Sequence, residues 1–334
     1  METTFEVVEQ SQVAQVRRLA MEIGRAHDLS EEDIGRAAIV ATEAATNLVK
    51  YGERGTVTLS PFFDEGSVGV QMIVMDHGPG FPDFSGAVRD GFSTGGSLGL
   101  GLGSMMRASD LFEAYAGPQQ GTAFLARVAR GRTRPGAADH RLAVGARRAA
   151  MRGETECGDA WGHARCGRWD RLCLVDGLGH GPMAAIAAQQ AVAVFRAAGE
   201  SATPADIVQQ CHEAIGATRG AVMGVAAIDA DGGRVLFAGV GNIAGMVYSA
   251  TDSHHLLSTE GIVGHNMRKV RVVERPWSRG DSIVLSTDGL SGRWNLARYP
   301  GLVHRHALLV ASVLFRDFAR NTDDATVIVA KGLK

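Results

Sequence analysis

Hydrophobic positions in the first 130 residues alternate between helical spacing and strand spacing. Apolar residues recur every three or four positions over residues 11–27, which predicts an amphipathic helix. Ser30 is followed by three acidic residues and marks the start of a second helix, which should run to about residue 50. Four β-rich runs predict strands at 56–63, 68–75, 112–116 and 122–128. This order predicts helices packed on a sheet.

Beyond residue 140 the pattern changes to short strands separated by long helical stretches. The predicted strands are 142–146, 172–175, 222–228, 235–238, 282–286 and 326–330. The predicted helices are 184–198, 204–217 and 302–320. This alternation predicts a second domain of layered sheets and helices. Residues 129–140 lack periodicity and contain Gly, Pro and repeated Arg, so we predict a linker there.

Composition supports two domains and locates the charge. The chain has 334 residues and a net charge of −2, and this length suggests about two domains. Residues 1–127 carry 17 acids and 9 bases, residues 128–153 carry 1 acid and 7 arginines, and residues 154–334 carry 18 of each. The basic stretch is either a solvated linker or a docking patch for an acidic partner. Nothing in the overall charge favours nucleic acid or a membrane surface.

Cysteine usage and the apolar runs favour a cytoplasmic protein. None of the four cysteines forms a CxxC pair, which argues against a zinc ribbon or a thioredoxin motif. The first ten residues show no signal-peptide pattern, and the longest apolar run is interrupted by Gln and Arg. We therefore expect a cytoplasmic protein with no membrane segment.

Four pieces of the first half predict a nucleotide pocket. Glu43 and Asn47 are four residues apart, on one face of the second predicted helix. Asp76-His77-Gly78-Pro79-Gly80 follows a predicted strand, and a Gly-rich run over residues 95–103 enters a helix, where its amides could meet phosphates. Gly121-Thr122 begins the last strand. Each piece alone also fits a helix surface or an ordinary loop, but their order favours a pocket. Neither a P-loop nor a Rossmann fingerprint is present.

With these motifs, residues 1–128 resemble the GHKL (Bergerat-fold) ATPases, specifically the anti-sigma-factor serine kinases of the RsbT and RsbW type. The resemblance implies a Bergerat-type α/β sandwich over residues 1–130 that binds ATP with Mg²⁺. It makes Glu43 the catalytic base, Asn47 the magnesium ligand and Asp76 the adenine reader. The implied ATP-binding residues are Asn47, Asp76, Gly78, Gly80, Gly95, Gly96, Ser97, Leu98, Gly99, Leu100, Gly101 and Thr122.

The second half places aspartates at the ends of predicted strands. They occur in Gly158-Asp159, Asp176-Gly177, Asp288-Gly289 and Asp323-Asp324. Each Asp-Gly alone is a turn signal. Carboxylates that converge at one sheet edge, however, form an oxygen-only ligand set suited to Mg²⁺ or Mn²⁺. Two such ions can activate a water and bind a phosphate.

In the order of these motifs, residues 138–334 resemble the SpoIIE-like branch of the PPM metal-dependent serine/threonine phosphatases, near RsbX. The resemblance implies a PPM-type α-β-β-α sandwich over residues 141–334, after a basic linker at 131–140. It makes Asp159, Asp176, Asp288 and Asp323 ligands of two Mn²⁺ or Mg²⁺ ions, with the Gly177 carbonyl as a further ligand. Asp324 is an alternative to Asp323.

The two resemblances together predict a bifunctional α/β regulator of a partner-switching pathway. The first domain would phosphorylate a serine or threonine of a STAS-domain partner, an anti-sigma antagonist or a stressosome-type protein. The second domain would remove that phosphate. Two alternatives stay open: the first domain is a non-catalytic ATP sensor, or it sequesters a sigma factor or a downstream switch protein and so gates the phosphatase. Intact Glu43 argues against a pure sensor, which needs no base.

Overall fold

The structure is a computed structural model that describes residues 2–64, 67–80, 101–117, 120–132, 142–249 and 251–333. It divides into two compact units, each with its own sheets and core. Unit 1 comprises Met1–Asp139 and Ala297–Arg305, and unit 2 comprises His140–Leu296 and His306–Lys334. Within the described residues, no helix is long and apolar enough to cross a membrane.

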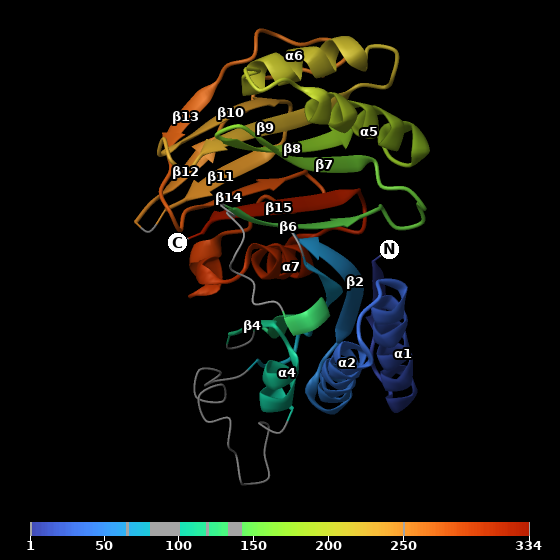
Figure 1. The fold of residues 1–334 in the computed structure, drawn as a ribbon. Coiled ribbons are helices and arrows are strands. Elements are labelled where there is room, and N and C mark those ends of the chain that lie inside the picture. The colour runs from blue at the N-terminus through green and yellow to red at the C-terminus, as the bar shows by residue number, and fades with distance from the viewer. Residues whose placement is uncertain are drawn as a thin grey trace. The chain divides into compact units, whose positions relative to one another are not determined.

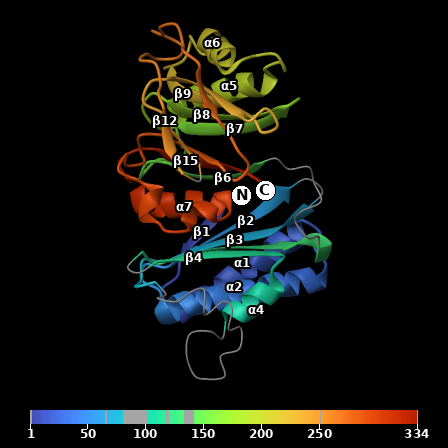
Figure 2. The same ribbon diagram turned by 90° about the vertical axis from the view of Figure 1, so that its left-hand side faces the viewer.

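Unit 1, whose strands are coloured from blue to green in Figure 1, is built on one antiparallel sheet of five strands in the order β1-β2-β3-β5-β4. The strands are β1 (Thr3–Glu6), β2 (Thr56–Asp64), β3 (Ser67–Met75), β4 (Leu111–Ala116) and β5 (Thr122–Ala129). Helices α1 (Gln10–Ala26), α2 (Glu31–Tyr51) and α4 (Leu102–Ala108) cover one face of this sheet (Figure 2). The result is the predicted α/β sandwich.

Helix α2 begins where the sequence predicts. The Ser30 hydroxyl accepts a hydrogen bond from the Asp33 amide at 3.1 Å, and three acids in the first turn suit the positive end of the helix dipole. Half of the buried residues of α2 are alanines, including Ala37, Ala41 and Ala44. These small side chains let the helix lie close to the sheet, so the polar residues of α2 have fixed positions.

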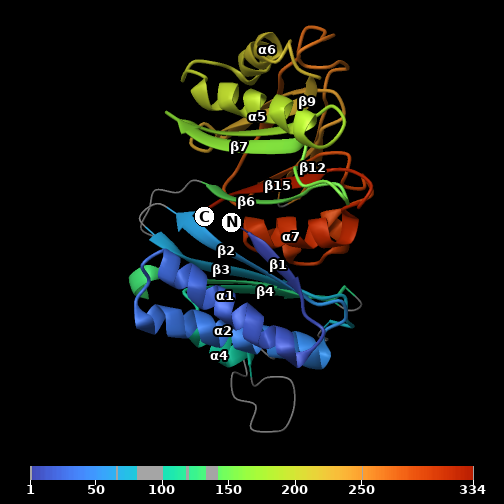
Figure 3. The ribbon, with the colours of Figure 1, turned by 90° about the vertical axis from the view of Figure 1, so that its right-hand side faces the viewer.

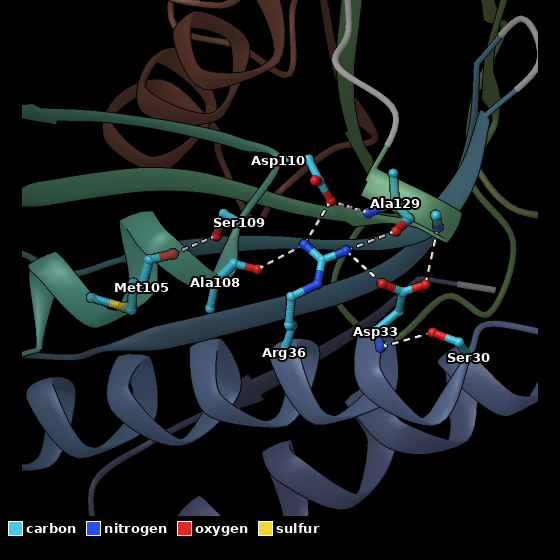
Figure 4. A network of polar contacts seen from close by, with 9 residues as sticks. Ser30, Asp33, Arg36, Met105, Ala108, Ser109, Asp110 and Ala129 are labelled. Carbon is cyan, nitrogen blue, oxygen red and sulfur yellow. Dashed lines mark hydrogen bonds and ion pairs between the residues drawn. The ribbon is translucent and has the colours of Figure 1, made fainter.

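A buried charged network ties the start of α2 to the end of the sheet (Figure 4). The Arg36 guanidinium donates to Asp33 Oδ1 at 2.6 Å, to Asp110 Oδ2 at 3.0 Å and to the Ala129 carbonyl at 3.1 Å. The other Asp33 oxygen accepts from the Gly131 amide at 3.0 Å. Because each buried charge has partners, the network fixes α2 against β5 and the chain that follows it.

Unit 2 contains two five-stranded antiparallel sheets, ordered β13-β10-β9-β8-β7 and β12-β11-β14-β15-β6. The first sheet has β7 (Asp159–Cys166), β8 (Trp169–Gly177), β9 (Ala221–Asp229), β10 (Arg234–Val240) and β13 (Val273–Pro276). The second has β6 (Leu142–Ala149), β11 (Ala244–Tyr248), β12 (Ser253–Leu256), β14 (Ser282–Ser286) and β15 (Ala325–Gly332).

Helices cover the outer faces of both sheets of unit 2 (Figure 3). α5 (Pro182–Ala197) and α6 (Pro204–Ala214) pack on the first sheet, and α7 (Ala307–Phe318) packs on β6 and β15 of the second. One apolar core lies between the sheets and another under α5 and α6. This arrangement confirms the predicted α-β-β-α sandwich.

The helix predicted over residues 302–320 is shorter than expected. A 3₁₀ turn occupies Leu302–His304, Arg305 is extended, and α7 begins only after His306. His306 accepts the Leu308 amide through Nδ1 at 3.2 Å and so caps the new helix. Leu302 in the turn and most residues of α7 are buried, so the apolar pattern spans both pieces and spacing alone merged them.

Candidate nucleotide and metal sites

Helix α2 presents Glu43 and Asn47 one turn apart, both half-buried, and the end of the Gly-rich run lies against them. A Cβ atom placed on Gly101 would be 2.8 Å from Glu43 Oε2 and 3.0 Å from Asn47 Nδ2. Only a residue without a side chain therefore fits at this position unless α2 side chains move. The structure thus brings together the catalytic, magnesium-binding and glycine residues expected from motifs more than fifty residues apart.

Asp76 lies at the end of β3 in a turn that its own side chain stabilises. It is 9% exposed, and its Oδ1 accepts the Gly78 amide at 2.7 Å. Its backbone amide donates to the Thr122 carbonyl at 2.9 Å, which joins the turn to the start of β5. The His77 amide donates to the Glu53 carbonyl at 2.8 Å. These bonds hold Asp76 beside the chain that leaves α2, one turn beyond Asn47.

Gly80 shows why glycine is needed in this turn. Its φ is +70°, and a Cβ atom there would lie 2.2 Å from the Gly117 carbonyl oxygen. A side chain would therefore clash with rigid backbone. The predicted phosphate-contacting residues Gly95, Gly96, Ser97, Leu98, Gly99 and Leu100 lie outside the described residues.

In unit 2, Asp159 and Asp176 face each other across adjacent strands. They are register partners in the β7–β8 pair. Asp159 is buried; its Oδ2 accepts from the Thr287 hydroxyl at 2.9 Å, while its Oδ1 is buried without a hydrogen-bond partner. Two like charges opposite each other destabilise a sheet. An orphaned carboxylate oxygen beside a second carboxylate is therefore the donor set that a divalent cation fits.

The raised pKa values of Asp159 and Asp176 also indicate a site that a divalent cation fits. Burial raises the pKa of Asp159 to about 7, and the Asp324 and Asp323 charges add to this effect. Burial together with the Asp159 and Asp288 charges raises the pKa of Asp176 to about 8. Both shifts follow from several carboxylates sharing a space with little water. Across the described ranges, however, no three His, Cys, Asp or Glu side chains already form a metal-binding group.

Asp176, Asp288 and Asp323 line one cavity of about 510 Å³. Asn242 also lines it and donates from Nδ2 to Asp288 Oδ2 at 2.8 Å. A Cβ atom on Gly177 would lie 2.1 Å from the Ala184 carbonyl oxygen, so the residue after Asp176 packs directly against α5. The cavity therefore gathers three of the four predicted aspartate ligands. The fourth, Asp159, is not among its lining residues and lies on the neighbouring strand opposite Asp176.

The two aspartates of the Asp323-Asp324 doublet accept hydrogen bonds from different partners. Both Asp324 oxygens accept backbone amides, from Met151 and from Gly158, each at 2.8 Å. Asp323 is half-buried and lines the cavity, and among the described residues its Oδ1 accepts only the adjacent amide of Asp324. This geometry favours Asp323 as the ligand and gives Asp324 the task of fixing the chain before β7.

Sequence reasoning missed the polar residues that orient these carboxylates. Thr287 and Asn242 carry no motif of their own, although Thr287 directly precedes Asp288. His180, by contrast, lies in the glycine-rich string that follows Asp176, and its Nδ1 contacts Glu154 Oε1 at 2.6 Å at the cavity edge. Thr287 and Asn242 come from other elements, and only the position of Thr287 beside an aspartate could have signalled one of them.

Comparison with known proteins assigns each half. Residues 7–126 match the histidine kinase-like ATPase domain, and residues 170–332 match the stage II sporulation protein E (SpoIIE) family. The serine/threonine-protein kinase RsbT of Bacillus subtilis (strain 168) is 31% identical over 110 residues, which cover 33% of this chain and 83% of that protein. The chain belongs to the RsbT family, fused to a SpoIIE domain.

Solved structures support this assignment. A chain from a structure of the bacterial stressosome, a modular system adapted to control secondary messenger signalling, is 33% identical, with a TM-score of 0.54 over 57% of this chain and 100% of that one. RsbX in complex with magnesium shares the fold, at 18% identity and a TM-score of 0.53 over 58% and 97% of the two chains.

The RsbT–SpoIIE fusion is thus a protein serine/threonine phosphatase that also carries a serine/threonine kinase-type ATPase domain. Such a pairing is that of a partner-switching regulator. Glu43, Asn47, Asp76 and Thr122 fall within the ATPase match. Asp176, Asp288 and Asp323 fall within the SpoIIE match, whereas Asp159 precedes it.

Proposed function

We propose that the two domains act in opposite directions on one partner. The RsbT-like domain would transfer the γ-phosphate of ATP to a serine or threonine, and the SpoIIE domain would hydrolyse that phosphoester. The observation that carries the kinase half is Glu43 beside Asn47 and Gly101. A carboxylate at this place can serve as a base, which a domain that only senses ATP does not need.

In the kinase reaction, Glu43 would accept the proton of the attacking hydroxyl while an oxygen–phosphorus bond forms and the bond to ADP breaks. Asn47 would bind the Mg²⁺ that accompanies ATP, through its amide oxygen. Asp76 would accept a hydrogen bond from the adenine amine. Gly101 leaves room for the nucleotide next to Glu43 and Asn47.

In the phosphatase reaction, Asp159, Asp176, Asp288 and Asp323 would hold two Mn²⁺ or Mg²⁺ ions, with the Gly177 carbonyl as a further ligand. Such ions, when bound, supply a water of lowered pKa and positive charge for the phosphate. The remaining residues position these ligands. Thr287 fixes Asp159, and Asn242 fixes Asp288.

We propose a STAS-domain protein as the partner, either an anti-sigma antagonist or a stressosome-type scaffold. Support comes from the likeness to RsbT and to a stressosome structure. A protein that uses ATP on such a partner would work in the cytoplasm.

The test is transfer of labelled phosphate from ATP to candidate STAS proteins by the full chain. We expect transfer by the wild type and loss of transfer in Glu43→Ala, with no change in Glu22→Ala, an exposed helix carboxylate in α1. Release of the label should need Mn²⁺ or Mg²⁺ and should be absent in Asp176→Asn. Release without added metal would contradict the aspartate site.

Two other outcomes identify the alternatives. If the chain binds ATP and no label moves, the first domain is a sensor. If a sigma factor is retained by the chain in a pull-down with ATP and no label moves, the domain sequesters that factor.

A further inference from the structure

The described residues that line the cavity of unit 2 carry an excess of negative charge. Its described lining includes four carboxylates and one imidazole, but neither lysine nor arginine. Two divalent cations would offset the carboxylates, yet a phosphorylated substrate brings a further charge of about −2. A phosphate ester would therefore bind better if a cationic side chain reached the cavity from outside its lining.

Arg219 is placed to do this. It is exposed and lies in the connection between α6 and β9. Its Nη1 is 3.1 Å from the position that a Cβ atom on Gly179 would take, and Gly179 lines the cavity. The guanidinium thus packs directly on the loop that follows Asp176. Gly179 has a φ of +87°, so a side chain there would be strained and would also push Arg219 away.

The backbone around Arg219 is fixed to the same loop. The Leu178 amide donates to the Gly220 carbonyl at 3.0 Å, and the Gly220 amide donates to the Thr218 hydroxyl at 3.1 Å. The Ala221 amide donates to the Val263 carbonyl at 3.0 Å. The backbone that carries Arg219 is therefore hydrogen-bonded to the loop that follows Asp176, and only the long side chain has to move to contact a ligand.

The guanidinium also lacks a competing partner. Within the described residues, Arg219 makes neither an ion pair nor a hydrogen bond. A guanidinium offers five donors in a planar fork that matches the oxygens of a phosphate. A structural arginine would instead have its donors occupied, as Arg171 has with three carbonyls of the α5–α6 connection.

We propose that Arg219 binds the non-bridging phosphate oxygens of the phosphoserine or phosphothreonine substrate. This inference rests on the proposed phosphatase function. Arg219 would add the positive charge that the lining lacks and would orient the phosphate from the Gly179 side. It takes no part in holding metal.

The test uses the full chain loaded with Mn²⁺, with p-nitrophenyl phosphate as substrate and inorganic phosphate as product inhibitor. In Arg219→Ala, we expect KM and the inhibition constant of phosphate to rise about tenfold, as for loss of a charged hydrogen bond. The value of kcat and the Mn²⁺ concentration for half-maximal activity should change less than about threefold. Arg219→Lys should restore part of the affinity, because lysine keeps the charge and loses the fork.

Calorimetric titration of inorganic phosphate into the Mn²⁺-loaded protein gives a readout independent of turnover. Arg196→Ala is the matched control, since it removes an exposed arginine from the last turn of α5, outside the cavity lining. Phosphate binding that is equal in wild type and Arg219→Ala would overturn the inference. If the wild type hydrolyses nothing, the phosphatase proposal fails, and calorimetry alone still decides on Arg219.

Discussion

Asp159 and Asp176 occupy a place where the fold alone gains nothing from two carboxylates. Their positions opposite each other in β7 and β8 bring like charges together at a buried sheet edge. Such an arrangement is retained when an added cation reverses the sign of the interaction. These two residues therefore destabilise the metal-free sheet, although the proposed cation site needs both of them.

This destabilisation predicts that Asp176→Asn stabilises the metal-free protein. Removal of one charge should contribute about 1 kcal/mol, which raises the melting temperature of a domain of this size by about 3 °C. The same variant should lose most of the stabilisation that Mn²⁺ gives the wild type. Thermal melts in chelator and in Mn²⁺ check both effects. Asp252→Asn, an exposed carboxylate, is the control, and a less stable metal-free Asp176→Asn would refute the argument.

A second prediction concerns Gly101. In Gly101→Ala, the added methyl would meet Glu43 Oε2 and Asn47 Nδ2, so these side chains must leave their positions. We expect ATP affinity to fall about tenfold, as overpacking of 1–2 kcal/mol implies. Gly35→Ala is the matched control on α2, because nothing lies within 4 Å of its Cβ position. It should bind ATP normally and stabilise the helix by about 1 kcal/mol. Fluorescent-nucleotide titration measures the affinities, and unchanged binding by Gly101→Ala would count against the pocket.

Motif reasoning at the residue scale found the groups that carry charge or need glycine. Those groups are constrained by chemistry, so they recur in recognisable strings such as Asp76-His77-Gly78. It did not find Thr287, Asn242 or Arg219. Thr287 is 128 residues from the carboxylate it orients, and Asn242 is 46 residues from Asp288. Pairs of this kind are set by sheet register, which no local pattern encodes.

At the scale of elements, the network around Arg36 makes the position of α2 sensitive to acid. Burial alone would raise the pKa of Asp33, but the hydrogen bonds from Arg36 and from the Gly131 amide outweigh it and hold that pKa below its usual range. A group with a lowered pKa in the folded state contributes stability above its unfolded pKa of about 3.9. That contribution is lost as pH falls through the folded value.

Asp33→Asn should therefore destabilise unit 1 by about 3 kcal/mol at neutral pH, since it leaves a buried guanidinium short of one carboxylate. The difference from wild type should shrink as pH falls below about 4. Urea unfolding followed at pH 7 and at pH 3 measures both values. The exposed first-turn variant Glu31→Gln is the control. A difference that stays constant with pH would show that the ion pair is not its source.

Element prediction succeeded where the apolar period was strong and failed where it was weak or continuous. The spacing in α1 and α2 and the β-branched runs of β9 and β15 gave elements within a few residues of the observed bounds. Strand β7 was missed because Asp159–Cys166 contains no β-branched residue and one large apolar side chain, that of Trp161. Its conformation comes from pairing with β8, a tertiary effect that overrides local propensity.

At the scale of the whole molecule, the acidic block of residues 1–127 coincides with the ATPase match. Its charge opposes that of ATP, so bulk attraction does not explain nucleotide binding. Under the proposed function, local groups would do so, namely backbone amides and a cation on Asn47. Likewise, residues 154–334 carry equal numbers of acids and bases, so their net charge gives no sign of the aspartates that line the cavity of unit 2. The overall charge therefore predicts neither of the two proposed activities, because each would depend on a few local residues.

Opposed activities in one chain predict a futile cycle that stoichiometry can reveal. With ATP, Mg²⁺, Mn²⁺ and a STAS partner, the wild type should release many molecules of ADP for each phosphorylatable site, because each phosphate added is removed again. Asp176→Asn should stop after one ADP per site and leave the partner fully phosphorylated. Glu43→Ala should release none. An equimolar mixture of the two variants should restore the cycle, because the partner carries the phosphate between chains. Coupled ADP detection with mass spectrometry of the partner measures both quantities. If Asp176→Asn and wild type release ADP alike, the two domains do not act on the same phosphate.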